Sequence, residues 1–232
     1  LKQSPKDISM TGNKANVSGL MSAYYSDMGG FAYLQGNSKL TLAGENGATL
    51  TIGDANAADK TIDSIASIGG YENSANELIL KGNVVINSSL EAFSDKITVA
   101  DNANVTMATG FASDRISLQA DINKYPDEAY DDYGTSELTL GENASLNMGS
   151  LVINRAGYTG TDKNGVKNDN PGVKITAGQN SILNLKSLEI VTKNYLSKGK
   201  ETNVTTTGYG LFNLTDAAVN VAGDVTLAEN TR

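Results

Sequence analysis

Residues 138–153 read LTLGENASLNMGSLVI, and residues 175–190 read ITAGQNSILNLKSLEI. The two segments align without a gap at a shift of 37 positions. A third copy, residues 212–227 (FNLTDAAVNVAGDVTL), keeps this shift at both ends with one compensating slip inside. Two weaker copies lie upstream, residues 97–107 (ITVADNANVTM) and residues 40–52 (LTLAGENGATLTI), the latter with one or two inserted residues. Self-similarity at a fixed spacing is the signature of a repeat architecture, so this segment decides the fold.

Each copy contains three short aliphatic triplets separated by polar bends rich in Asn and Gly. Side chains alternate along an extended strand, so the spacing predicts that six aliphatic side chains of residues 138–153 point to one face. These are Leu138, Leu140, Leu146, Met148, Leu151 and Ile153. Thr139 and Asn147 then point the other way. Asn and Gly tolerate the left-handed backbone conformation that tight bends require.

Two stackings of such units are possible, and the repeat favours one of them. In an antiparallel sandwich or barrel, consecutive triplets would form hairpins, but few Asn-Gly or Asp-Gly pairs stand where hairpin turns would need them. In a parallel solenoid, the triplets form successive sides of one coil and each coil pairs with the next. We therefore predict an all-β parallel solenoid in which Leu138 lies near Ile175 and Asn147 lies near Asn184.

The 21 residues between copies are the second part of the prediction. They are either an excursion without strands or a second coil with an irregular side, and the sequence leaves this open. In the stacked arrangement they emerge on the same edge as neighbouring loops, residues 119–137, 154–174 and 191–211.

These loops supply the candidate partner-binding residues. Tyr is amphipathic and loses little entropy on contact, which makes it common at binding surfaces, although Tyr also packs down to stiffen loops. The candidates are Tyr125, Asp127, Tyr130, Asp131, Asp132, Tyr133, Tyr158 and Tyr195. The first loop carries six acidic residues against one basic residue, whereas the other two carry a net +2 each. Patches of opposite sign suit self-association, or they are solvated loops that contribute little.

Composition excludes several classes of function. The chain has no Cys, His or Trp, which removes disulfides, Ser-His-Asp and Cys-His catalysis, and the usual zinc and haem sites. A net charge of −8 argues against nucleic acid as a partner, and no apolar run reaches the length of a membrane span. Adjacent acids such as Asp131 and Asp132 are a poor means of fixing the separation that glycosidases need. We expect no enzymatic activity, no cofactor and no metal site.

The phrasing L-T-L-G-x-N-A-x-L-x-M/V-x-x-L-x-I, in a Cys-free chain rich in Asn, Thr and Gly, resembles the passenger region of bacterial autotransporters. The resemblance covers residues 38–230 and rests on the repeat pattern. It implies a right-handed parallel β-helix with loop excursions on one edge, displayed outside the Gram-negative outer membrane. It also implies an adhesive role toward a host or bacterial surface protein or glycan, or toward a second copy. Carbohydrate-binding or polysaccharide-degrading β-helix proteins share the pattern and remain the alternative.

The chain divides into two regions. Residues 1–37 follow the repeat poorly and are predicted to form an irregular N-terminal coil or a capping segment. Residues 38–232 form the repeat region, which we expect to be a fragment of a longer chain.

Overall fold

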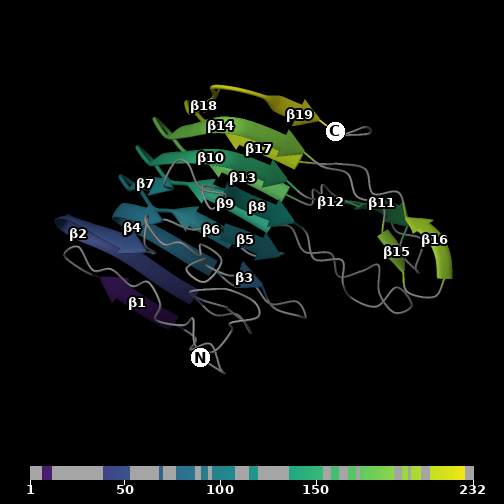
Figure 1. The fold of residues 1–232 in the computed structure, drawn as a ribbon, viewed down its shortest axis with the longest axis horizontal. Coiled ribbons are helices and arrows are strands. Elements are labelled where there is room, and N and C mark those ends of the chain that lie inside the picture. The colour runs from purple at the N-terminus through teal and green to yellow at the C-terminus, as the bar shows by residue number, and fades with distance from the viewer. Residues whose placement is uncertain are drawn as a thin grey trace, which may run out of the picture.

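The computed structural model describes 14 stretches of the chain. These are residues 7–11, 39–52, 68–69, 77–86, 90–93, 96–107, 115–119, 136–153, 158–161, 167–170, 173–190, 195–197, 200–204 and 210–227. Within these stretches all regular structure is β, and 15 strands belong to one sheet that wraps around a common interior. Figure 1 shows the strands stacked from β1 and β2 at one end to β18 and β19 at the other.

The sheet has three sides, which we call side 1, side 2 and side 3, each a stack of parallel strands. Side 1 contains β1 (Asp7–Thr11), the first part of β2 (Lys39–Ile52), the first part of β4 (Glu77–Ile86), β6 (Lys96–Val99), β9 (Ser136–Leu140), β13 (Val173–Ala177) and β17 (Gly210–Leu214). Side 2 contains the second parts of β2 and β4, β7 (Asn104–Met107), the first parts of β10 (Ser145–Ile153) and β14 (Ile182–Ile190), and β18 (Ala218–Val221). Side 3 contains β3 (Ile68–Gly69), β5 (Leu90–Phe93), β8 (Arg115–Gln119), the second parts of β10 and β14, and β19 (Val225–Leu227).

The chain visits the three sides in turn, and successive windings stack like on like. Ile175 pairs with Leu138, and Asn147 pairs with Asn184. Both pairings were predicted from the repeat and are confirmed, and the antiparallel sandwich is wrong for this sheet. This is the arrangement of a parallel β-solenoid.

The interior is a continuous column of aliphatic side chains. All six residues predicted to share one face are buried: Leu138, Leu140, Leu146, Met148, Leu151 and Ile153. Met148 and Leu151 are three positions apart, an odd spacing that strict alternation would place on opposite faces. Both point inward because the chain turns a corner within β10, between side 2 and side 3.

The corner between sides 1 and 2 contains left-handed backbone in each winding where it is described: Asn46 and Gly47 in β2, Gly82 in β4, and one residue in each of the four later windings. Asn102, Asn143, Asn180 and Asp216 all have positive φ, between 46° and 58°. Their backbones continue the pairing between windings, since the N–H of Asn143 donates to the carbonyl of Gln179 at 2.9 Å. Gly141 precedes this corner, and a Cβ there would lie 2.7 Å from the backbone nitrogen of Asp101. The G-x-N pattern therefore has a physical reason: a side chain at Gly141 would clash with the neighbouring winding, and Asn143 tolerates the left-handed backbone.

The copy at residues 212–227 shows the predicted slip directly. Phe212 pairs with Ile175 at a shift of 37, Ala218 pairs with Ile182 at 36, and Val225 pairs with Leu188 at 37 again. One residue is missing at the first corner and one is added at the second.

The coil count left open by the sequence is now settled for the described windings. Lys96 pairs with Glu77 only 19 positions earlier, so a bare winding needs about 19 residues. The longer windings add an excursion after side 3. Two excursions contain antiparallel hairpins, β11 (Tyr158–Thr161) with β12 (Lys167–Asn170), and β15 (Tyr195–Ser197) with β16 (Lys200–Val204). In these two intervals the described residues thus match neither alternative, because they form a hairpin that is separate from the sheet of the rod.

Candidate functional site

The two hairpins form the most prominent departure from the rod. Both follow side 3 of their windings, and Figure 1 shows them at the same end of the strands. Tyr158 and Tyr195 each begin the first strand of a hairpin, and they are 37 positions apart. The repeat spacing therefore extends from the rod into the excursions, and it places a Tyr at equivalent backbone positions in successive windings.

The remaining candidate residues belong to the excursion before β9. Tyr125, Asp127, Tyr130, Asp131, Asp132 and Tyr133 lie outside the described residues. Tyr158 lies in β11 and Tyr195 lies in β15. Tyr158 and Tyr195 thus occupy corresponding places in the sequence of their windings, and the grouping of all eight candidates stays a prediction.

The ends of the predicted loops belong to the rod instead. Gln119 ends β8, Ser136 begins β9, Val173 begins β13 and Gly210 begins β17. Glu137, Lys174 and Leu211 were the last residues of the three loop ranges, but they occupy consecutive positions on side 1. Glu137 and Lys174 were assigned to loops because a charged residue at the start of a strand resembles the polar loop before it.

Side 1 carries an alternating ladder of charge on its outer surface. The strand register places Lys39, Glu77, Lys96, Glu137 and Lys174 one above another. The ammonium of Lys39 lies 2.9 Å from the Glu77 carboxylate, that of Lys96 lies 4.0 Å from it, and that of Lys174 lies 3.9 Å from the Glu137 carboxylate. Exposed pairs of this kind contribute little individually, but a misaligned stack would bring like charges together.

Glu77 is the centre of this ladder. Its partial burial raises the pKa of the carboxyl, but hydrogen bonds from Lys39 and Thr98 and the positive charges of Lys39 and Lys96 outweigh that effect. The pKa of Glu77 therefore lies below its ordinary value. The hydroxyl of Thr98 donates to Glu77 Oε1 at 2.8 Å, so the carboxylate is fixed from two windings.

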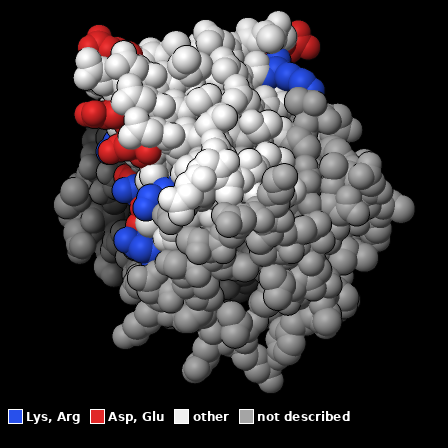
Figure 2. Space-filling view, turned by 90° about the vertical axis from the view of Figure 1, so that its left-hand side faces the viewer, with Lys and Arg blue, Asp and Glu red and all other residues white. Residues whose placement is uncertain are grey.

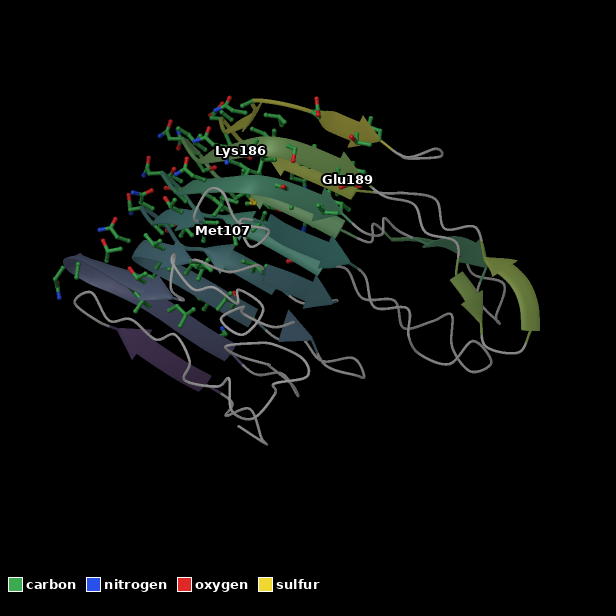
Figure 3. The ribbon with its side chains drawn as sticks, viewed as in Figure 1. Met107, Lys186 and Glu189 are labelled. Atoms are coloured by element: carbon green, nitrogen blue, oxygen red, sulfur yellow. The ribbon has the colours of Figure 1, made fainter. Side chains whose placement is uncertain are left out.

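Two asparagine ladders run along the rod parallel to its axis. At the first corner, Asn180 Nδ2 donates to Asn143 Oδ1 at 3.2 Å, and Asn143 Nδ2 donates to Asn102 Oδ1 at 3.3 Å. On side 2, Asn220 Nδ2 donates to Asn184 Oδ1 at 2.8 Å, and Asn184 Nδ2 donates to Asn147 Oδ1 at 2.7 Å. Figure 3 shows the side chains of the stacked corners projecting at one end of the strands, with fully buried Met107 inside.

The outer surface of side 2 differs from side 1 because it carries no charge between β7 and β18. Its outward positions are Asn104, Thr106, Ser145, Asn147, Ile182, Asn184, Ala218 and Asn220. In Figure 2 the described acidic and basic side chains gather at one margin and at one upper corner, with uncharged residues between. Such a surface can recognise a partner by hydrogen bonds and apolar contact, but it offers no acid–base pair.

Within the described ranges, no three acidic side chains come together as metal ligands would. No helix capable of crossing a membrane occurs in that part of the chain. Comparison with known proteins gives no match to a protein family, to a curated protein sequence or to a solved structure.

Sequence reasoning missed one winding and the side 1 ladder. The winding at β4 was overlooked because its triplets, Leu78-Ile79-Leu80 and Val84-Val85-Ile86, lack alternation and its corner is two residues shorter than the repeat. The ladder was detectable in principle, since Lys or Glu stands immediately before the first triplet of five copies.

Proposed function

We propose that this chain is a non-enzymatic segment of a bacterial cell-surface adhesin. It is a right-handed parallel β-helix that stands outside the Gram-negative outer membrane and presents its edge hairpins to a host or bacterial surface protein or glycan. The register of the windings supports the parallel rod. The two hairpins support the proposal that the rod presents contact elements at one edge. A right-handed winding is favoured because crossovers between parallel strands of a sheet are right-handed in about 98% of cases.

The observation that carries the proposal is the equivalence of Tyr158 and Tyr195. A winding closes without any excursion, since Phe93 connects to Lys96 through only two residues. The hairpins are therefore additions that the rod does not need for closure. Their recurrence at one edge, each beginning with Tyr, fits a row of contact elements held at a fixed spacing.

The rod is suited to this task because its buried core cluster is made of residues from its own windings. Aliphatic side chains form one buried cluster that runs through the described windings, and asparagine ladders link successive windings outside. Loops on a rigid scaffold bind at a smaller entropic cost than loops on a flexible one.

The test is an adhesion assay with a variant that keeps the rod. Replacing residues 155–172 by one serine copies the short connection that follows Phe93, and residues 192–209 are replaced in the same way. Beads coated with the chain are incubated with cultured epithelial cells, with bacterial cells and with an array of surface glycans. The proposal predicts binding to one of these surfaces that falls by about tenfold in the variant without hairpins and in Tyr158→Ala/Tyr195→Ala.

Thr106→Ala is the matched control, because Thr106 points outward from side 2, away from the hairpin edge, and this substitution should leave adhesion unchanged. Full adhesion by a folded variant without hairpins would contradict the proposal, as would the absence of binding to any of the three surfaces.

A further inference from the structure

The corner of β2 places two exposed residues with left-handed backbone next to each other. Residues 45–48 stand between the two paired parts of β2, and the register with β4 passes over them. Asn46 and Gly47 have φ angles of 55° and 76°. Both are exposed, and a Cβ added to Gly47 would meet no described atom within 4 Å. The peptide bond between them therefore has more room to rotate than a paired strand would leave it.

An Asn followed by Gly carries a reaction of its own. The backbone nitrogen of the second residue attacks the side-chain amide carbon of the Asn, the N–Cγ bond forms, and Nδ2 leaves as ammonia. The product is a succinimide ring, which water opens at either carbonyl to give aspartate or isoaspartate. No oxidant or reductant is needed. Glycine favours the attack because it has no Cβ and reaches most backbone conformations.

The corner asparagines of the later windings are followed by residues that resist this attack. Ala103, Ala144 and Ser181 stand directly after Asn102, Asn143 and Asn180, and each is only 1% exposed. The N–H of each donates to the carbonyl three residues earlier, at 3.1, 3.3 and 3.1 Å respectively. The attacking nitrogen is therefore held in a hydrogen bond, and its residue cannot rotate without leaving the interior.

The side-chain amides of the later corners are held as well. The ladder joins Asn180 to Asn143 and Asn143 to Asn102. Within the described residues this ladder ends at Asn102, because the β4 corner supplies Lys81 and Gly82 and no Asn. Asn46 thus differs from the other corner asparagines both in its following residue and in its place outside the ladder.

We propose that Asn46 is a modification site, at which the folded chain undergoes spontaneous deamidation by water while the rod protects Asn102, Asn143 and Asn180. The product changes the net charge from −8 to −9, because a neutral amide becomes a carboxylate. The rod accommodates an acid at such a corner, since Asp216 occupies the corner of the last described winding with a φ of 46°. The chain therefore gains a permanent negative charge at this corner as it ages, without losing its fold.

Peptide mapping by mass spectrometry tests the proposal on the full unmodified chain. The chain is incubated at mildly alkaline pH, once folded and once in concentrated urea, and the conversion of Asn to aspartate and isoaspartate is followed at positions 46, 102, 143 and 180. Folding should slow the conversion of Asn102, Asn143 and Asn180 by about tenfold or more, whereas the two rates at Asn46 should agree within a factor of about two. Each position is compared with itself, so the intrinsic effect of the following residue cancels.

Reading the rates peptide by peptide separates Asn46 from Asn164, which also precedes a glycine and lies outside the described residues. Protection of Asn46 equal to that of the other three asparagines, or equal rates in the folded and unfolded chain at all four positions, would overturn the proposal. These rates do not depend on adhesion, so failure of the proposed function would be distinguishable from failure of this inference.

Asn46→Asp tests whether the rod keeps its fold after the reaction. Its urea midpoint should match that of the unmodified chain, as the acid at Asp216 leads us to expect. Asn143→Asp is the matched comparison, because it places the acid inside the ladder, where it loses the amide donor to Asn102. Its midpoint should be lower. Unfolding of Asn46→Asp at a lower urea concentration than Asn143→Asp would contradict the claim that the fold survives modification at Asn46.

Discussion

Asn143 and Asn147 stand four positions apart in the same winding. Replacing each by glycine or by alanine should destabilise the fold, but the more destabilising substitution should be alanine at position 143 and glycine at position 147. Asn143 has a φ of 55°, in the left-handed region. An ordinary L-residue there costs about 1–2 kcal/mol, a cost that glycine avoids. Replacing Asn143 also removes two ladder hydrogen bonds, to Asn102 and from Asn180. Each is exposed and contributes about 0.5 kcal/mol.

Asn143→Gly should therefore lower the free energy of unfolding by about 1 kcal/mol through the lost hydrogen bonds alone. Asn143→Ala loses the same bonds and adds backbone strain, for a total of about 2–3 kcal/mol. Alanine is the worse substitution at this corner.

Asn147 lies within β10, where the backbone is extended. Its side chain accepts a hydrogen bond from Asn184 at 2.7 Å and donates one to Ser145 at 3.3 Å, and both substitutions remove these. Glycine adds a loss of about 0.5–1 kcal/mol because it has more conformational freedom to lose in a strand. Glycine is the worse substitution here.

Urea unfolding followed by circular dichroism measures all four variants against the unmodified chain. The midpoints should rank Gly above Ala at position 143 and Ala above Gly at position 147. The same ranking at both positions would refute the assignment of left-handed corners and extended sides, whatever the absolute stabilities.

Leu146→Ala removes a fully buried side chain from the interior column and should cost about 2–5 kcal/mol in urea unfolding, whereas a loss below about 1 kcal/mol would mean that Leu146 is not in a packed interior. Glu77→Gln should cost about 0.5–1.5 kcal/mol at neutral pH because Lys39 and Lys96 lose their anionic partner. Since the folded pKa of Glu77 is lowered, this stabilisation is complete above the unfolded pKa of about 4.3 and disappears as pH falls through the folded pKa. An equal difference in unfolding free energy between the two proteins at pH 7 and at pH 2.5 (about three pH units above and about two below that unfolded pKa) would contradict this account.

The sequence was sufficient for the stacking and for much of the register. Aliphatic positions recur at one spacing, and burial of those positions leaves one way to align the copies, because a slip of one residue would expose the whole set. The same logic indicated that residues 212–227 contain a compensating slip and that residues 40–52 contain inserted residues, and the register shows both.

Other features could not be read from the sequence for physical reasons. The winding at β4 has apolar residues on both faces, with Ile79 and Val85 pointing outward, so it shows no alternation to detect. The hairpins were missed because Tyr158–Thr161 and Lys167–Asn170 contain no aliphatic residues whose alternation would indicate a strand. Pairing across windings, such as Glu77 between Lys39 and Lys96, becomes visible only when coil lengths are known.

The most direct test of the stacked windings is a disulfide cross-link between Asn147→Cys and Asn184→Cys. The chain contains no cysteine, so the two thiols are the only ones present. Parallel partners lie about 4.8 Å apart, within the Cα range that a disulfide spans. Asn147→Cys with Lys186→Cys is the register control, because two further residues along the strand bring the separation to about 8 Å, beyond that range. We predict rapid oxidation of the 147–184 pair and little of the 147–186 pair; equal cross-linking of both pairs, or of neither, would contradict the stacking of the windings.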